Sequence, residues 1–208
     1  MIKVYFSKIG SEWDASTLNE QLSLFPIAMK EKIMRYKEWR ARQSRILGKQ
    51  MLLRLIRDFE QDLALSDLQY SPLNKPFFEG SFNFSIAHSG DMVICTASVD
   101  SQIGIDIEHK ASLDIADYKE QLTKNEWDYI QNASDRLNTF YEIWTRKEAW
   151  LKATGRGVDI DLNEIDVCGD TAKSGDIEYS FLPINIELNY TANIATSEAY
   201  IEIEVSEF

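Results

Sequence analysis

Two stretches of the chain carry clear periodic patterns of apolar and polar residues. Over Phe140–Gly157 the bulky positions recur at three- and four-residue steps and two glycines follow, which predicts a helix that ends at those glycines. Over Ile103–Glu108 the apolar residues alternate with Gly104, Asp106 and Glu108, which predicts a strand. Because the side chains of a strand alternate between its two faces, we expect both carboxylates on the same side.

The rest of the chain predicts further helices and strands. The expected helices are one from Ile27 to about Phe59, opened by Pro26 and divided at Gly48 or within Arg40–Ser44, and one opened by the capping box Thr123-x-x-Glu126. The expected strands lie at Ile2–Phe6, Phe82–Ile86, Met92–Val99, within Ile177–Ile194 and at Ala199–Val205. Pro183 favours an edge strand or a bulge, because proline cannot donate to a ladder.

The order strand, helices, strands occurs twice and is split near residue 101. The pattern therefore predicts an α+β fold with two halves, residues 1–101 and 102–208. The length of 208 residues and the 44% hydrophobic content allow one good-sized core or two small ones. Cys95 and Cys168 are isolated, so we expect neither a disulfide framework nor a cysteine metal site. No stretch resembles a targeting or membrane segment, and a cytoplasmic location is expected.

Charge is distributed unevenly along the chain. The net charge is −12, yet residues 30–57 contain ten basic and two acidic residues, so this segment is +8 and the remainder is −20. A local positive field on an acidic body suits the capture of a compact polyanion. It does not suit tracking a long phosphate backbone, so we expect no nucleic-acid partner. Solvated helix faces account for some of these residues.

Glu148 lies one turn after Trp144 and one turn before Lys152 on the predicted helix. Taken alone, Glu148 and Lys152 could be a surface ion pair worth about 0.3–0.5 kcal/mol, and Asp106 with Glu108 could be the solvated face of a strand. Two carboxylates side by side repel each other unless a cation or strong donors lie between them. If the helix packs over the strand, three carboxylates and a lysine converge, which favours a hard divalent cation held against a phosphate.

These two stretches resemble the paired signature of the 4'-phosphopantetheinyl transferases, specifically the surfactin-synthetase-activating (Sfp) type. GIDIE at Gly104–Glu108 matches the family pattern G-[IV]-D-[IVL]-E, and WTRKEAWLK at Trp144–Lys152 matches W-[ST]-x-K-E-[AS]-x-x-K. The resemblance extends to Phe84–Gly90, similar to F-[NS]-[IV]-S-H-[ST]-G, and to Asn74–Pro76, similar to G-K-P. Either motif alone is a modest signal, whereas the two in this order are specific.

The resemblance implies two similar α+β halves related by pseudo-twofold symmetry, with the active site between them. It implies transfer of the phosphopantetheine arm of coenzyme A to a serine of an acyl, peptidyl or aryl carrier protein, with release of adenosine 3',5'-bisphosphate. Asp106, Glu108 and Glu148 would hold Mg²⁺ or Mn²⁺. Glu148, directly or through a metal-bound water, would act as the base for the serine, and Lys152 would stabilise or protonate the departing phosphate. A monomer is the simplest expectation for a chain with two duplicated halves.

Five further residues are implied as coenzyme contacts. His88 would donate to a phosphate oxygen, Ser89 is a possible backbone donor to the coenzyme, and Lys75 would lie beside the adenosine, with Asn74 in place of the family glycine. Arg45 is the candidate for the ribose 3'-phosphate, with Arg42 and Lys49 as rivals, because a guanidinium can grip phosphate through two bonds. Lys147 is expected to contact a phosphate. Ala87 departs from the family serine and removes a hydroxyl expected to touch the coenzyme's phosphate.

Two other function classes remain open from the sequence. A metal-dependent phosphohydrolase would use the same carboxylates with water as nucleophile, and a coenzyme A sensor would bind the ligand without transfer. The carrier protein and its pathway are equally open, as is the choice between Mg²⁺ and Mn²⁺.

Overall fold

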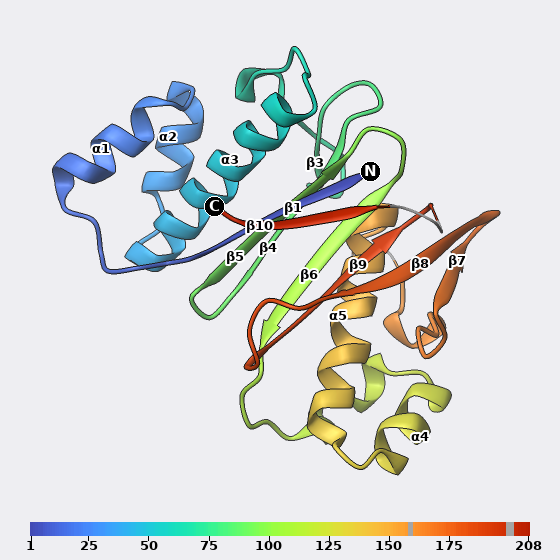
Figure 1. Ribbon diagram of the computed structural model, residues 1–208. Coiled ribbons are helices and arrows are strands. Elements are labelled where there is room, and N and C mark those ends of the chain that lie inside the picture. Colours follow the sequence, from blue (N-terminus) through green and yellow to red (C-terminus); the bar gives the residue numbers. More distant parts are fainter. Residues whose placement is uncertain (158–159, 199–201) are drawn as a thin grey trace.

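The computed structural model describes residues 1–157, 160–198 and 202–208 and has a mixed α and β architecture (Figure 1). Its helices are α1 (Ala15–Ser23), α2 (Ile27–Met34), α3 (Trp39–Asp58), α4 (Lys124–Asn132) and α5 (Arg136–Thr154). Its strands are β1 (Ile2–Lys8), β2 (Gln69–Tyr70), β3 (Pro76–Phe77), β4 (Asn83–Ser89), β5 (Met92–Ser98), β6 (Ile103–His109), β7 (Thr171–Ser174), β8 (Ile177–Ile184), β9 (Tyr190–Thr196) and β10 (Ile203–Glu207).

The strands form two four-stranded sheets and one short hairpin. The first sheet has the order β10-β1-β5-β4, and the second has the order β6-β9-β8-β7. Pairing is antiparallel throughout except between β10 and β1, which run parallel. Strand β10 thus carries the end of the described chain into the first sheet, and both termini lie beside that sheet (Figure 1). The expected division of the chain at residue 101 stays a prediction. Strand β10 belongs to the second half in sequence but to the first sheet in space.

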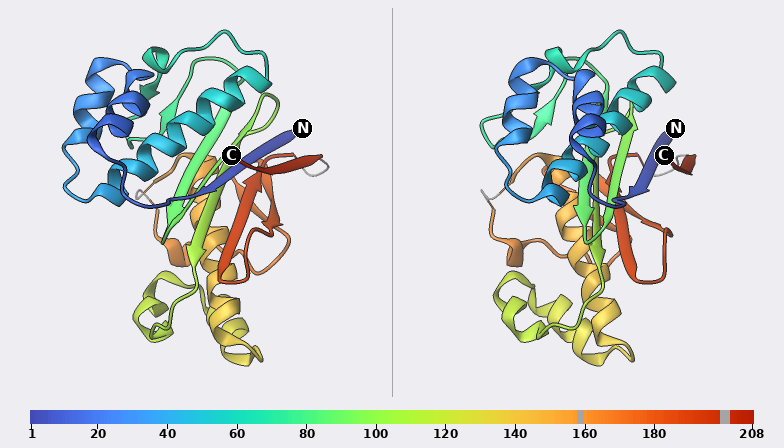
Figure 2. Two further views of the ribbon diagram at one scale, coloured as in Figure 1. Left: turned by 60° about the vertical axis from the view of Figure 1, so that its left-hand side comes forward. Right: turned by 90° about the vertical axis from the view of Figure 1, so that its left-hand side faces the viewer.

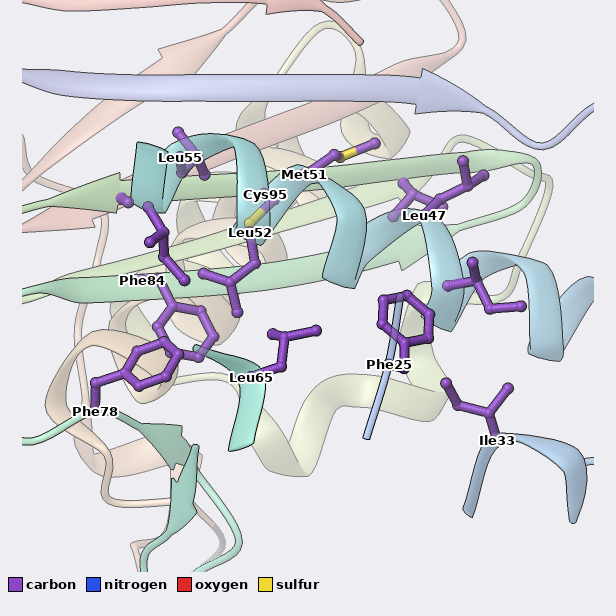
Figure 3. Close-up of a cluster of buried hydrophobic side chains, with 14 of the residues drawn as sticks. Phe25, Ile33, Leu47, Met51, Leu52, Leu55, Leu65, Phe78, Phe84 and Cys95 are labelled. Atoms are coloured by element: carbon purple, nitrogen blue, oxygen red, sulfur yellow. The ribbon is translucent and has the colours of Figure 1, made fainter. Parts of the chain in front are cut away.

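Each sheet carries helices, and a third core lies between the sheets. Helix α3 packs on β1, β4 and β5, while α5 runs along β6 and β9 with α4 against it, an arrangement that can be followed from two sides (Figure 2). Under α1–α3 the core is built around Phe25, Leu52 and Phe84 (Figure 3). The third core joins residues such as Val4, Ile105 and Ile194 from the inner faces of both sheets.

The edges of the two sheets meet where β4 lies alongside β6. Ile105 N donates to Ser85 Oγ at 3.1 Å, and His109 N donates to Ser89 Oγ at 3.0 Å. The constant offset of 20 residues means that the two strands run in the same direction. Serine hydroxyls therefore satisfy backbone donors of the β6 edge that would otherwise need a neighbouring strand.

Most sequence predictions of secondary structure are confirmed. Helix α1 was not predicted, α5 begins at Arg136 and not at Phe140, and two further boundaries differ. The chain between Ile27 and Asp58 breaks at residues 35–38 and not at Gly48 or within Arg40–Ser44. Gly48 lies inside α3, where the lack of a side chain lets the helix approach β4 closely. An added Cβ would stand 2.8 Å from Ile86 Cγ2. The strand predicted at Ala199–Val205 begins at Ile203 in the structure, and residues 199–201 lie outside the described part.

The other predicted features agree with local geometry. Thr123 and Glu126 form the capping box reciprocally. Pro183 occupies a part of β8 that lies beyond the residues paired with β7, so its missing N–H removes no ladder bond on that side. Among residues 1–157, 160–198 and 202–208, no helix is long and apolar enough to cross a membrane.

Candidate active site

Helix α5 lies directly on strand β6 at Gly104. A Cβ at this position would stand 2.1 Å from Ala149 O and 2.4 Å from Ala153 N. Only glycine allows so close an approach of helix and strand. The two-residue period of the strand then places Asp106 and Glu108 on the face that carries Gly104, which is the face toward α5.

Asp106 and Lys152 form a close ion pair where these two elements meet. Lys152 Nζ donates to Asp106 Oδ1 at 2.6 Å, and Asp106 is only 5% exposed. Burial raises the pKa of the Asp106 carboxyl to about 7; the Lys152 ammonium opposes this shift, and the negative charges of Glu108 and Glu148 add to it. The three acids are therefore within electrostatic range of one another.

Glu108 is oriented by Ser89 across the junction of the two sheets. Ser89 Oγ donates to Glu108 Oε2 at 2.6 Å and accepts from His109 N. Both bonding directions of the hydroxyl are used, so its proton is committed to the carboxylate. The structure thus places the Ser89 hydroxyl at an acid, and the contact of the Ser89 backbone with the coenzyme stays a prediction.

Glu148 lies on the exposed side of α5 that borders a pocket, and it is half-buried. Burial raises the pKa of the Glu148 carboxyl, Lys152 lowers it, and Glu108 raises it. A carboxylate with a raised pKa at the edge of a pocket is suited to accept a proton near neutral pH.

The expected convergence of three carboxylates into a ready-made metal site is not found. In the part of the chain that the structure describes, no three histidine, cysteine or acidic side chains stand close enough to hold a metal ion as placed. The Lys152 ammonium takes up one oxygen of Asp106.

The donor set nevertheless fits a hard divalent cation. Asp106 Oδ2 is buried and has no hydrogen-bond partner among the described residues, although buried polar atoms are almost always bonded. Ser89 engages one oxygen of Glu108, namely Oε2. Carboxylate oxygens are the ligands that Mg²⁺ prefers.

A pocket of about 670 Å³ opens beside these acids. Its walls come from α2, α3, β4, the loop before β3, α5 and the segment that follows α5. Among its described lining residues are Lys32, Arg45, Lys49, Lys75 and Lys152, against one carboxylate, Glu148. Such a lining favours an anion with several charges.

Two lysines of this pocket are partly buried cations. Burial lowers the pKa of Lys49 and of Lys75. Lys75 Nζ donates to Ala153 O at 2.9 Å, near the C-terminus of α5. Arg45 lies one turn before Lys49 on α3, and its guanidinium carbon stands 3.7 Å from the ring centroid of Tyr36. This cation–π contact with Tyr36 holds the Arg45 guanidinium at the wall of the pocket.

His88 also lines the pocket, at the end of β4. Burial lowers the pKa of the His88 imidazole, and the cations Arg45 and Lys152 lower it further. An imidazole repelled by two cations is a neutral donor until an anion arrives. Ala87 next to it points into the core between the sheets.

Asn74 stands where the similar family motif G-K-P has its glycine. Its φ is +61°, a left-handed conformation that glycine adopts freely and asparagine tolerates. Asn74 N donates to Ser71 O, which closes the turn that leads to Lys75. The backbone requirement behind the motif is therefore met without glycine.

Lys147 is a core residue, and the prediction that it contacts a phosphate is wrong. Its side chain is 0% exposed, and Nζ lies 2.8 Å from Glu126 Oε2 and donates to Leu162 O and Ile165 O. These bonds use all three protons of the ammonium. Burial lowers the pKa of Lys147, and Glu126 opposes that shift.

Sequence patterns alone did not single out several residues of the site. Tyr36 and Tyr70 line the pocket, and the ring centroid of Tyr70 lies 4.5 Å from Lys32 Nζ. Asn193, on β9, pairs with Asp106 across the sheet. The sequence does show Asn193 as a polar residue at the centre of an apolar strand. Its position beside Asp106 follows only once the pairing of β9 with β6 is known.

Fold and site together define a mixed α and β protein whose cationic pocket borders Glu148 and reaches the buried Asp106 through Lys152, a combination suited to chemistry on a phosphorylated ligand. Residues 102–201 match the sequence family described as the 4'-phosphopantetheinyl transferase superfamily. The match covers 100 of the 208 residues, and over that region the resemblance inferred from the motifs is confirmed.

Curated relatives carry the same description. The chain is 27% identical over 169 residues to the 4'-phosphopantetheinyl transferase gsp of Aneurinibacillus migulanus, covering 78% of this chain and 70% of that protein. It is 32% identical over 116 residues to the L-aminoadipate-semialdehyde dehydrogenase-phosphopantetheinyl transferase of Xenopus laevis, covering 48% of this chain but 38% of that protein. Among solved structures, holo-[acyl-carrier-protein] synthase of Thermotoga maritima aligns over 46% of this chain and 61% of that chain, at 13% identity and a TM-score of 0.37, which is too low to bear on the fold.

Proposed function

We propose that this protein transfers the 4'-phosphopantetheine group of coenzyme A to a serine hydroxyl of an acyl or peptidyl carrier protein. The match to the superfamily supports the reaction class. The observation that carries the proposal is the cationic pocket whose lining residue Lys152 forms an ion pair with the buried Asp106. A pocket of that charge suits the phosphates of coenzyme A, and the acids lie where a diphosphate would end.

The proposal includes the arrangement of the molecule around the ligand. Two halves related by a pseudo-twofold axis would hold the coenzyme between them. The first half contributes β1, β4 and β5 to a sheet that β10 completes, the second half contributes the sheet of β6 to β9, and the sheet edges meet at β4 and β6. His88 and Ser89 come from one edge and Asp106 and Glu108 from the other.

In the proposed reaction a bond forms between the serine oxygen and the phosphorus of the phosphopantetheine arm. The bond from that phosphorus to the bridging oxygen of the diphosphate breaks, and adenosine 3',5'-bisphosphate leaves. Glu148 takes the serine proton, for which its raised pKa is suitable. Lys152, held by Asp106, faces the charge that develops on the leaving phosphate.

Asp106 through Oδ2, Glu108 and Glu148 would hold Mg²⁺ or Mn²⁺. When bound, the cation would neutralise diphosphate charge. Ser89 keeps Glu108 oriented for this role. Arg45, Lys75 and His88 bind and orient the adenosine and phosphate end of the coenzyme along the pocket.

Intact-mass measurement of a carrier protein tests the proposal. After incubation with this protein, coenzyme A and Mg²⁺, the carrier should gain one phosphopantetheine, and a carrier with its acceptor serine changed to alanine should gain none. Glu148→Gln should abolish the gain. Consumption of coenzyme A with an unmodified carrier would identify a hydrolase instead, and bound but intact coenzyme A would identify a sensor.

A further inference from the structure

Two buried oxygens without partners stand opposite each other in the second sheet. Asp106 Oδ2 and Asn193 Oδ1 both lack a hydrogen-bond partner among the described residues. Asp106 on β6 and Asn193 on β9 are direct register partners. Residues paired in this way project from the same face of a sheet with their Cβ atoms about 4.5–5.5 Å apart.

Both side chains face helix α5. Lys152 of α5 bonds Asp106, and Asn193 Nδ2 donates to Thr145 Oγ1 of the same helix at 2.8 Å. Asn193 is 0% exposed. An unpaired acceptor is destabilising at such a position, so two of them side by side call for a shared partner.

The orientation of the Asn193 amide is fixed by its neighbour. Thr145 Oγ1 donates its one proton to a carbonyl of its own helix, with Tyr141 O at 2.8 Å and Glu142 O at 3.2 Å. It can therefore only accept from Asn193, which must present its NH₂ group to Thr145. An amide flip would place two acceptors face to face, so Oδ1 must point away from Thr145.

A side-chain donor for the two oxygens is hard to find in this layer. The ammonium of Lys152 is bonded to Asp106 Oδ1, and Lys147 is held by Glu126. Asn193 itself lines a second cavity of about 500 Å³, together with Lys110, Asn138 and Glu142. Lys110 Nζ is bonded to Asn138 Oδ1.

We propose that Asn193 belongs to the cation site, where its amide oxygen and Asp106 Oδ2 together receive a divalent cation or one of that cation's waters. An amide oxygen is an ordinary ligand for Mg²⁺ and Mn²⁺ and adds an oxygen without adding charge. A neutral fourth oxygen suits a site that already contains three acids. The inference rests on the proposed function only for the presence of a divalent cation.

Binding of Mn²⁺ alone to the whole chain, followed by electron paramagnetic resonance, tests the inference without a transfer assay. Asn193→Ala should weaken Mn²⁺ binding about 10- to 100-fold, as the loss of supporting groups at metal sites does. Thr145→Val is the matched control, because it removes the partner of Nδ2 and leaves Oδ1. It should weaken binding far less than Asn193→Ala.

Asn193→Asp keeps an oxygen and adds charge, so it should bind Mn²⁺ at least as tightly as the wild type. It decides the question should the alanine variant fail to fold. Equal weakening in Thr145→Val and Asn193→Ala, or weakened binding in Asn193→Asp, would reduce Asn193 to a structural link between β9 and α5 and overturn the inference while leaving the proposed transfer intact. A wild type that binds no Mn²⁺ would overturn the inference together with the metal part of the proposed function.

Discussion

At the scale of single residues, the charge of the buried Asp106 carboxylate lowers the stability of the folded protein. Burial and two neighbouring acids raise its pKa to about 7, and Lys152 compensates only in part. Because the folded pKa lies above the unfolded value, the folded protein binds the extra proton between about pH 4 and pH 7. The resulting penalty on stability is small at low pH and complete above pH 7.

Asp106→Asn should therefore raise the melting temperature of the cation-free protein. The gain should grow as pH rises from 4 to 7 and stay constant above, at roughly 2–4 °C for each kcal/mol relieved. The new amide also supplies a donor for the unpaired Asn193 oxygen. Transfer activity should fall by about 100-fold or more, because the charge that serves the cation is gone. Thermal melts across pH check this, and a lower melting temperature at pH 8 would contradict it.

Arg45 should determine recognition of the coenzyme's 3'-phosphate. Arg45→Ala should lower kcat/KM for coenzyme A by about 10- to 100-fold, the equivalent of one charge-assisted hydrogen bond. It should leave dephospho-coenzyme A, which lacks that phosphate, nearly unaffected. Arg57→Ala on the same helix is the control, because Arg57 is exposed and lies outside the lining of the pocket. Steady-state kinetics with both substrates decide it, and an equal loss for both would move the contact elsewhere.

At the scale of elements, the activity depends on how α5 lies on β6. Gly104 sets the distance between them, since its Cα faces the backbone of Ala149 and Ala153 directly. The same helix divides its two lysines: Lys152 reaches Asp106 at the pocket, while Lys147, five positions earlier, turns into the core. One helix thus supplies both the proposed reacting groups and the lysine of the ion pair that anchors it on α4.

Gly104→Ala should destabilise the protein by about 3 kcal/mol or more, because neither backbone can move without disturbing the other. Gly10→Ala is the matched control, since nothing lies within 4 Å of an added Cβ there. Urea unfolding of both variants measures the difference. An unchanged midpoint for Gly104→Ala would show that α5 does not pack as described.

Lys147→Ala should cost about 3–5 kcal/mol of unfolding free energy, because it leaves Glu126 buried without its cation. Lys147→Met combined with Glu126→Gln should recover most of that loss. The exposed ion pair of Lys124 and Asp128 on α4 is the comparison, and Lys124→Ala should leave the urea midpoint unchanged. A Lys147→Ala protein of normal stability but raised KM for coenzyme A would restore the phosphate contact predicted from the motif.

The helices and strands of the site could be predicted from the sequence more fully than the contacts that their side chains make. The strand with Asp106 and Glu108 and the helix with Glu148 and Lys152 follow from periodicity, because each pattern is local. The fate of Lys147 depends on Glu126, which is 21 positions away and buried by the packing of α4 on α5. The role of Asn193 likewise depends on the register of β9 with β6, which is a property of the assembled sheet.

At the scale of the whole molecule, charge and topology act together. The basic segment of residues 30–57 folds into α2 and α3, and its Lys32, Arg45 and Lys49 line the pocket on an otherwise acidic body. Strand β10 returns the chain to the first sheet beside β1. That pairing, like the meeting of β4 with β6, ties together the halves that supply the cations and the acids.

The efficiency of coenzyme A capture should depend on ionic strength. Raising NaCl from 50 to 500 mM should lower kcat/KM for coenzyme A by about 10-fold, because salt screens the local positive field. The melting temperature over the same range serves as the control for stability. A salt-independent kcat/KM would show that the pocket cations do not steer the ligand.

The position of a bound cation relative to coenzyme A tests the central claim most directly. Crystals grown with Mn²⁺ and coenzyme A should give one anomalous difference peak among the carboxylates of Asp106, Glu108 and Glu148, with the diphosphate beside it and the adenosine end in the pocket lined by Arg45 and Lys75. A peak at other residues, or coenzyme A bound outside this pocket, would contradict the account.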